Sequence, residues 1–149
     1  MPLTDLAVQR GVGLFETLRT YSKVPFLLGE RVERLLQSAK ELGFLKIPNK
    51  DLIEKKVSLG IAKVKAKEVL VKVIISAGEG ESLIPTSPAK LFIIFSPLHF
   101  WPQRFYDRGI NILTVRLGRS MPQYKSLSYI EASVAHKLAL RKGREEAMY

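Results

Sequence analysis

The sequence feature that most constrains the fold is the apolar segment from Val69 to Ser76. It is built almost entirely of Val, Ile and Leu, with Lys72 as its one charged residue. A nearly continuous run of branched apolar residues is typical of a strand that is buried on both faces. The segment from Leu91 to Phe95 has the same character. Strands of this kind need other elements packed over them, so the sequence predicts a layered structure.

A hairpin is predicted ahead of these strands. The residues from Leu14 to Tyr21 are rich in Phe, Thr and Tyr, which favours a strand. Ser22 and Lys23 then form a short turn, and the chain returns from Val24 to Leu28.

Two helices are predicted between this hairpin and the central strand. The first runs from Gly29 to Leu42, with Gly43 as its stop, and the second runs from Lys50 to about Lys65, with Asn49 as N-cap. Apolar residues recur in both at helical spacing and mark the faces expected to be buried. These residues are Val32, Leu35, Leu36, Ala39 and Leu42 in the first helix, and Ile53, Val57, Ile61 and Val64 in the second.

The rest of the chain is expected to contain a strand from Ile110 to Leu117, a polar connection, and a last helix from Ser128 to about Lys142. We therefore expect the α+β fold class, with a small antiparallel-sheet domain and two helices at residues 1–117. Residues 118–149 would form a linker and the first helix of an incomplete second domain.

Lys125 lies just before the last predicted helix, where Ser128 and Glu131 have the S-x-x-E spacing of a capping box. The positive end of the helix dipole would then lie near Lys125 and disfavour its ammonium form. A neutral lysine can attack a carbonyl and form a Schiff base. The chain has 24 Lys and Arg, however, and most lysines are solvated surface charges. Both interpretations of Lys125 stay open on this pattern.

Composition narrows the possible classes of function. Cysteine is absent, which excludes disulfides and thiolate metal sites, and neither His99 nor His136 has partners at ligand spacing, so no metal is expected. The chain has no apolar run of membrane-spanning length and no signal-peptide plan at its start, which favours the cytoplasm.

The net charge of +10 would suit a nucleic-acid partner. The basic residues between Lys50 and Lys67 are nevertheless interspersed with acidic ones, and no RNA-binding signature is present. The charge therefore suits an anionic small molecule at least as well as a nucleic acid.

Two stretches of the chain, taken together, carry a family resemblance. The first runs from Arg10 to Lys40 and contains the pattern G-x-G-x-F-E-T-x-R followed by E-R-L-x-x-S-A, and the second is Lys125 to Tyr129. Their order and separation resemble the N-terminal half of the class IV (fold type IV) pyridoxal-phosphate enzymes. That family contains branched-chain aminotransferases, D-amino-acid aminotransferases and 4-amino-4-deoxychorismate lyases. The similarity covers nearly the whole chain.

The resemblance implies roles in cofactor binding for three residues. Lys125 would form the Schiff base with pyridoxal 5'-phosphate and then shuttle the proton between Cα and C4′. Arg34 matches the helix arginine that contacts the cofactor phosphate, although its spacing alone would make it a surface arginine. Tyr129 lies near the position of a tyrosine that can bond the cofactor's phenolic oxygen. Otherwise Tyr129 would be a helix-start residue with its ring against the core.

Two more residues would lie on the substrate side by the same resemblance. Gly13, in the turn that starts at Gly11, would bring the backbone near the substrate, and Phe15 would face the substrate. The alternatives are an ordinary tight turn and a buried hairpin aromatic. Several family members carry Arg-Gly after the central strand, where the arginine helps to hold a substrate carboxylate, but this chain has Ala77 and Gly78. The choice of substrate therefore stays open.

Family members continue for another domain's worth of chain, which supplies the glutamate that pairs with the pyridine nitrogen. We therefore expect a truncated aminotransferase that acts on amino acids and 2-oxo acids, forms a homodimer, and has little activity as this chain alone. One alternative is a 4-amino-4-deoxychorismate lyase of the folate pathway. Another is a non-catalytic remnant domain.

Overall fold

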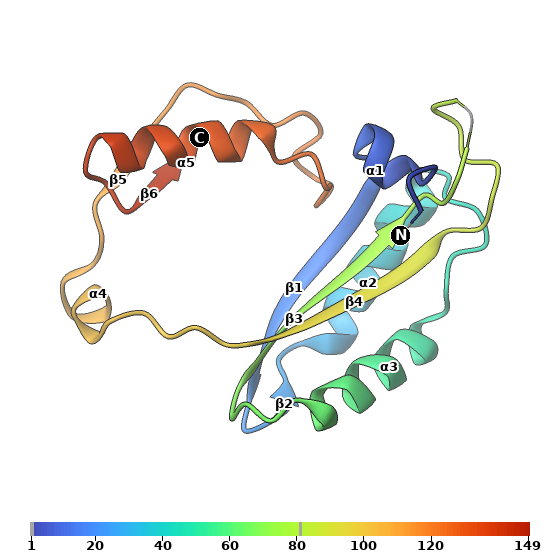
Figure 1. The fold of residues 1–149 in the computed structure, drawn as a ribbon, viewed down its shortest axis with the longest axis horizontal. Helices are drawn as coiled ribbons and strands as arrows, with labels where there is room; N and C mark the ends of the chain where they lie inside the picture. The colour runs from blue at the N-terminus through green and yellow to red at the C-terminus, as the bar shows by residue number, and fades with distance from the viewer. Residues whose placement is uncertain (1, 81) are drawn as a thin grey trace. The chain divides into compact units, whose positions relative to one another are not determined.

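The computed structural model describes residues 2–80 and 82–149 and divides into two compact units (Figure 1). The first unit comprises Met1–Leu98 with Tyr124–Leu127, and the second comprises His99–Gln123 with Ser128–Tyr149. The expected domain boundary at Leu117 stays a prediction.

The first unit is built on a four-stranded antiparallel sheet with the strand order β2-β1-β3-β4. β3 (Val69–Ser76) lies in the interior of the sheet between β1 (Gly13–Tyr21) and β4 (Lys90–Pro97). β2 (Val24–Pro25) pairs with β1 only at the far end, opposite Thr20 and Tyr21. The predicted α+β class with a small antiparallel sheet is confirmed, and the outer edge of β1 near Gly13 is left without β2 beside it.

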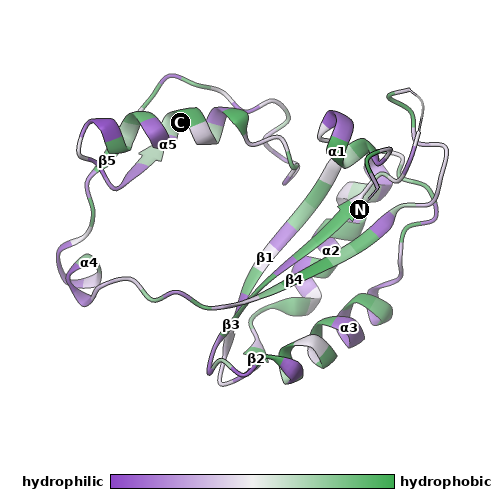
Figure 2. Cartoon of the chain, in the orientation of Figure 1, coloured by the Kyte–Doolittle hydropathy of each residue, from purple (hydrophilic) through white to green (hydrophobic). Residues whose placement is uncertain are grey.

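Helices α2 (Leu28–Glu41) and α3 (Lys50–Lys63) bury their apolar stripes against one face of this sheet. Because side chains alternate along a strand, one residue in two of β1 and β3 points into this core. Figure 2 shows β3 and β4 as mostly hydrophobic along their length. The core cluster comprises Leu6, Leu14, Leu18, Val32, Leu35, Ala39, Phe44, Ile53, Val57, Ile61, Val69, Val71, Val73, Ile75 and Ala77. Both predicted helices and their buried faces are therefore confirmed.

The capping residues of these helices also follow the sequence. The side chain of Asn49 accepts a hydrogen bond from the backbone N–H of Leu52 at 2.8 Å, as an N-cap should. Gly43 has a left-handed backbone with φ 72°, and Phe44 N–H donates back to the carbonyl of Ala39 at 2.9 Å. This hydrogen bond ends α2 at the position that Gly43 had predicted.

The sequence does not predict α1 (Leu6–Arg10), because five residues are too few to show a helical period. Asp5 is its N-cap and accepts a hydrogen bond from Ala7 N–H at 2.9 Å. The Asp5 side chain is completely buried, and its second oxygen accepts a hydrogen bond from the Ser76 hydroxyl at 2.9 Å. Asp5 thus attaches α1 to the end of β3.

The second unit contains α4 (Gln103–Arg108), β5 (Ile112–Thr114), α5 (Ile130–Arg141) and β6 (Glu146–Met148). β5 and β6 form a two-stranded parallel sheet. The predicted strand from Ile110 to Leu117 was too long, and β6 was not predicted. Ala135 and Ala139 are the only buried residues of this unit, all of which is described. Its apolar side chains are therefore mostly at the surface.

The predicted capping box at the start of the last helix is wrong. α5 begins at Ile130, and its N-cap residue, Tyr129, makes no side-chain cap hydrogen bond. Ser128 lies outside the helix by one further residue. α5 therefore begins five residues beyond Lys125, and because a helix dipole acts mainly within its first turn, it does not activate this lysine.

Candidate active site

Lys125 is held at the outer edge of β1 by backbone hydrogen bonds. Phe15 N–H donates to the carbonyl of Lys125 at 2.9 Å, and Leu127 N–H donates to the carbonyl of Gly13 at 2.9 Å. Ser126 forms an isolated antiparallel bridge with Leu14 between these two bonds. The short segment can pair there because β2 occupies only the other end of this edge. The main chain of Lys125 is therefore fixed by the first unit.

The alternation of side chains along this segment directs Lys125 away from the core. Tyr124 is half-buried and packs against the core cluster. The next residue of an extended segment points to the opposite side. The Nζ atom of Lys125 accordingly lies 4.8 Å from the centroid of the Phe15 ring. Phe15 alternates with Leu14, which belongs to the core, so its ring is on the sheet face opposite α2 and α3.

Gly13 is required for the close approach of this segment. A Cβ atom at Gly13 would lie 2.5 Å from Cδ1 of Leu127, and 3.3 Å from both Ala7 Cβ and the carbonyl oxygen of Ile75. Carbon atoms in ordinary contact are about 3.5–4.0 Å apart. The glycine therefore serves here to leave space for Leu127, two residues beyond Lys125.

A second lysine shares the Phe15 ring with Lys125. The Nζ atom of Lys72 lies 4.3 Å from the same ring centroid, and both lysine side chains are half-buried. Phe15 itself is only 5% exposed. Within residues 2–80 and 82–149, no ion pair joins either ammonium group to a carboxylate. Lys72 stood out in the sequence as the lone charge in an apolar strand, but nothing there connected it with Lys125.

Arg34 lies in an ion-pair cluster that the sequence did not predict. One oxygen of the buried Glu16 carboxylate accepts a hydrogen bond from Nε of Arg34 at 2.6 Å and forms an ion pair with Nη2 at 2.5 Å. The other oxygen lies 3.5 Å from Nη1 of Arg31. Glu16 is 2% exposed, whereas the side chain of Arg34 is 60% exposed. The part of the Arg34 guanidinium group that contacts Glu16 is thus held in place, while the rest of the side chain is exposed to solvent.

A shallow pocket of about 260 Å³ is lined by Leu27, Glu30, Arg31 and Arg34 at the first turns of α2. Nε of Arg31 is buried there without a hydrogen-bond partner among the described residues. Two guanidinium groups with donors to spare beside a helix N-terminus favour the binding of an anion.

Tyr129 belongs to the second unit, as the N-cap of α5. The guanidinium carbon of Arg119 lies 5.2 Å from the centroid of its ring. The structure therefore groups Gly13, Phe15 and Lys125 at one strand edge, and it holds Arg34 on Glu16 of the same strand.

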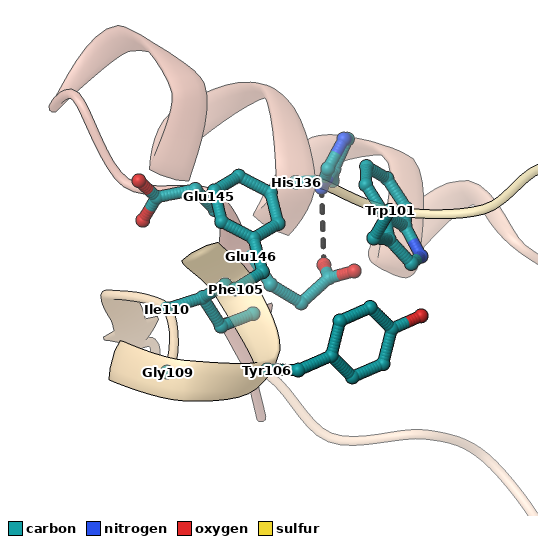
Figure 3. A pocket seen from close by; sticks show the side chains of 8 residues that line it. All are labelled: Trp101, Phe105, Tyr106, Gly109, Ile110, His136, Glu145 and Glu146. Carbon is teal, nitrogen blue, oxygen red and sulfur yellow. Dashed lines mark hydrogen bonds and ion pairs between the residues drawn. The ribbon is translucent and has the colours of Figure 1, made fainter. Parts of the chain in front are cut away.

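The second unit contains an aromatic pocket of about 330 Å³, lined by Trp101, Phe105, Tyr106, Gly109, Ile110, His136, Glu145 and Glu146 (Figure 3). Nδ1 of His136 lies 3.0 Å from a carboxylate oxygen of Glu146. The backbone N–H of Ala147, and after it His136, holds the pKa of Glu146 below its ordinary value. No lysine lines this pocket, so it offers no amine for carbonyl chemistry.

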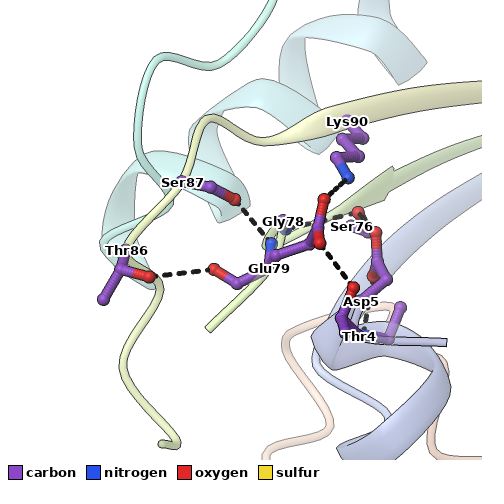
Figure 4. A network of polar contacts seen from close by, with 9 residues as sticks. Thr4, Asp5, Ser76, Gly78, Glu79, Thr86, Ser87 and Lys90 are labelled. Carbon is purple, nitrogen blue, oxygen red and sulfur yellow. Dashed lines mark hydrogen bonds and ion pairs between the residues drawn. The ribbon is translucent and has the colours of Figure 1, made fainter. Parts of the chain in front are cut away.

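A polar network joins the start of the chain to the loop after β3 (Figure 4). The carboxylate of Glu79 accepts hydrogen bonds from Lys90 and Thr4, and Glu79 N–H donates to the hydroxyl of Ser87 at 2.6 Å. The hydrogen bond from Lys90, and after it the one from Thr4, holds the pKa of the Glu79 carboxyl below its ordinary value. Lys90 is neutralised by this ion pair, so the network has a structural role.

No described residues form a group of three His, Cys, Asp or Glu side chains able to hold a metal ion. The helices formed by residues 2–80 and 82–149 are all too short or too polar to cross a bilayer.

The fold and the site together describe a small α+β domain that presents a lysine amine and a pocket lined by two arginines. Residues 13–149 match the family model for amino-transferase class IV. The chain therefore belongs to the class IV aminotransferase family, whose members depend on pyridoxal phosphate.

Individual relatives agree with this assignment. The chain is 30% identical, over 96% of its length, to a protein of Methanocaldococcus jannaschii assigned as a branched-chain-amino-acid aminotransferase, of which it covers 51%. Its fold matches a Legionella pneumophila protein assigned as a 4-amino-4-deoxychorismate lyase, with a TM-score of 0.86, 23% identity, and coverage of 100% of this chain and 56% of that one.

The pyridoxal-phosphate-bound form of a hypothetical aminotransferase from Mycobacterium tuberculosis matches with a TM-score of 0.78 and 26% identity, over 99% of this chain and 56% of that one. The chain thus spans about half the length of the relatives that it matches.

Proposed function

We propose that this chain forms the lysine-bearing part of a pyridoxal 5'-phosphate-dependent aminotransferase, which moves an amino group between an amino acid and a 2-oxo acid. The observation that supports this most is the placement of Lys125, with its main chain bonded to β1 and its Nζ 4.8 Å from the Phe15 ring. A lysine attacks a carbonyl only as the free amine, and a carboxylate partner would favour the ammonium form. Lys125 has no such partner among the described residues.

The residues present fit the cofactor in two respects. The amine of Lys125 would bond to its aldehyde carbon, and Arg34, together with the pocket that it shares with Arg31, would bind its phosphate. Tyr129 would bond the phenolic oxygen. When bound, the pyridine ring supplies a sink for the electrons of the substrate Cα–H bond. Lys125 would then carry the proton between Cα of the substrate and C4′ of the cofactor.

The substrate would lie against Phe15 and the backbone at Gly13. Lys72 offers a cationic group on the same face, with Nζ 4.3 Å from the Phe15 ring. An ammonium group at this position can bind a substrate carboxylate, for which Ala77 provides no side-chain donor. We therefore propose that Lys72 contributes to recognition of the acidic group of the amino acid and the 2-oxo acid.

The test is covalent trapping of the cofactor. The protein is incubated with pyridoxal 5'-phosphate, so that the lysine amine adds to the aldehyde and water leaves. Borohydride then adds hydride to the C=N carbon, and water supplies the proton to nitrogen. Peptide mapping should find the reduced adduct on Lys125 at cofactor concentrations that leave other lysines unmodified.

Two variants serve as controls for this experiment. Lys125→Ala should abolish the selective adduct, whereas Lys55→Ala, which removes an exposed lysine of α3, should leave it unchanged. Labelling spread evenly over many lysines in the unchanged protein would exclude a special role for Lys125. The assay measures labelling instead of turnover because the relatives are about twice as long as this chain.

We further propose a homodimer and a location in the cytoplasm, the latter supported by the absence of cysteine. Light scattering of the purified protein tests the first of these. The family match favours the aminotransferase, and the lyase and remnant alternatives are not favoured.

A further inference from the structure

We propose that Glu16 is a positioning residue that fixes the guanidinium group of Arg34 for binding an anionic group, an inference that rests on the proposed contact between Arg34 and the cofactor phosphate. Glu16 itself would not touch the ligand. It would act through the geometry of Arg34.

The hydrogen bonds of Arg34 define which part of its guanidinium group is held. Nε donates a hydrogen bond to one oxygen of Glu16 at 2.6 Å, and Nη2 forms an ion pair with the same oxygen at 2.5 Å. The remaining group, Nη1, has no protein partner within residues 2–80 and 82–149. An exposed arginine otherwise samples many rotamers, and ordering them costs conformational entropy. Glu16 therefore holds one edge of the fork and leaves the opposite corner available.

The position of Glu16 on β1 makes it a rigid support. Its strand neighbours on the same face are Leu14 and Leu18, and both belong to the apolar core. A carboxylate that is 2% exposed in such a row is costly to bury unless it is paired. Residues that break the local apolar pattern in this way often mark functional sites.

The presence of Arg31 beside Glu16 indicates that Arg34 does more than neutralise this carboxylate. One arginine would balance the charge, yet the carboxylate is approached by two, Arg34 at 2.5 Å and Arg31 at 3.5 Å. Both line the same pocket of about 260 Å³. Glu30 also lines this pocket, so the two arginines and two glutamates are neutral overall, and it is the free donors of the guanidinium groups that suit an anion.

Two substitutions separate positioning from simple electrostatics. Glu16→Asp keeps the negative charge but withdraws the carboxylate by about 1.5 Å, which exceeds the tolerance of hydrogen bonds of this length. Glu16→Gln keeps an acceptor oxygen in place but removes the charge. Positioning predicts that Glu16→Asp weakens anion binding and Glu16→Gln nearly preserves it. A purely electrostatic role predicts no change for Glu16→Asp and tighter binding for Glu16→Gln.

The measurement compares pyridoxal 5'-phosphate with 5'-deoxypyridoxal, which has the same aldehyde but no phosphate and no 5'-hydroxyl that could close onto the aldehyde. For each protein, the concentration that gives half-maximal labelling of Lys125 is determined with both compounds. The unchanged protein should favour the phosphorylated compound by roughly tenfold or more, as expected for hydrogen bonds to a charged group. Glu16→Asp should reduce this preference toward one, and Glu16→Gln should stay within about threefold of the unchanged protein.

Glu33→Gln is the matched control, because Glu33 lies next to Arg34 in α2 but pairs with Lys50 at 3.4 Å on the surface. It should leave the preference unchanged. An unaltered preference in Glu16→Asp, with only a lower melting temperature, would reduce Glu16 to a structural ion pair and overturn the proposal. The proposal would also be overturned if Glu16→Gln showed a stronger preference for the phosphorylated compound while Glu16→Asp kept the preference of the unchanged protein.

A second readout does not depend on the cofactor. The Nε–H signal of Arg34 in ¹H–¹⁵N NMR spectra should be resolved in the unchanged protein and in Glu16→Gln, and averaged by exchange in Glu16→Asp. Inorganic phosphate should shift this signal in the first two proteins at lower concentrations than in the third. If Lys125 is not labelled selectively, the proposed function fails, while the phosphate titration still decides the role of Glu16. A signal in the unchanged protein that phosphate does not move would refute the inference about Glu16.

Discussion

Replacing Gly13 with alanine should loosen the segment that carries Lys125 from the edge of β1. The new Cβ would lie 2.5 Å from Cδ1 of Leu127 and 3.3 Å from the carbonyl oxygen of Ile75. Ile75 is part of the paired β3 backbone and cannot move away without breaking the sheet. Leu127 and the chain around it are the parts that must yield.

The magnitude follows from the contacts that hold the segment. Two backbone hydrogen bonds join it to β1, one at Phe15 and one at Leu127, and each contributes about 1 kcal/mol. Alanine also stiffens the unfolded chain, which stabilises the folded protein by about 0.4–1 kcal/mol. We therefore expect global stability to fall by about 1 kcal/mol or less. The free energy of opening this segment alone should fall by about 1–2 kcal/mol.

Amide hydrogen exchange measures this opening directly. The N–H groups of Phe15 and Leu127 donate the two bonds, so their exchange should become roughly 5- to 30-fold faster in Gly13→Ala. Gly118→Ala is the matched control, because a Cβ at Gly118 meets nothing within 4 Å. Unchanged exchange at both amides would show that the space left by Gly13 does not hold the Lys125 segment in place.

Three further predictions concern the first unit. Gly60→Ala should lower the free energy of unfolding by about 1 kcal/mol, because the new Cβ overlaps the Phe95 ring. This loss should appear in a denaturant titration although alanine has the better helix propensity, and adding Phe95→Leu should restore part of it. Asn49→Ala should cost about 1 kcal/mol by the same titration, through loss of the N-cap bond, and an unchanged midpoint would contradict this.

The third prediction is a dependence on pH. Hydrogen bonding to Lys90 lowers the pKa of Glu79 from its ordinary value of 4.5, so its stabilisation is complete above that pH and disappears as the pH falls through the lower, folded value. Glu79→Gln should remove this part of the acid dependence in unfolding curves recorded between about pH 6 and pH 3.

The elements that could be predicted from the sequence are those whose signal is local and periodic. The eight-residue strand Val69–Ser76 was predicted with its observed bounds, and the buried faces of α2 and α3 followed from spacing alone. Asn49 and Gly43 could be identified because a cap acts within one turn of its helix. The short helix Leu6–Arg10 has no such period and depends on Asp5 bonding to Ser76, a contact across 71 residues.

In the candidate site, too, the residues could be identified from the sequence, but their contacts across the chain could not. The family resemblance selected Arg34 and Phe15, and the resemblance together with the local pattern selected Lys125, but the partners that define their environment were not predicted. Glu16 lies 18 residues from Arg34, and Lys72 lies more than 50 from Lys125. Only the pairing of β1 with β3 brings Lys72 near Phe15, since Thr17 is opposite Lys72 in the register. Side-chain partners of this kind follow from sheet register, which the sequence did not specify.

Because the predicted capping box does not form, Lys125 is positioned by β1 and not by the helix that follows it. A dipole argument would place the origin of its reactivity in the helix that follows, but α5 begins five residues later and lies in the other unit. The hydrogen bonds that fix Lys125 come instead from Phe15 and Gly13, and the ring beside its amine belongs to the same strand. The opposite face of that strand carries Glu16, which holds Arg34. β1 therefore positions both Lys125, the proposed nucleophile, and Arg34, the proposed anion-binding group, through adjacent residues, so a shift of this one strand would disturb both together.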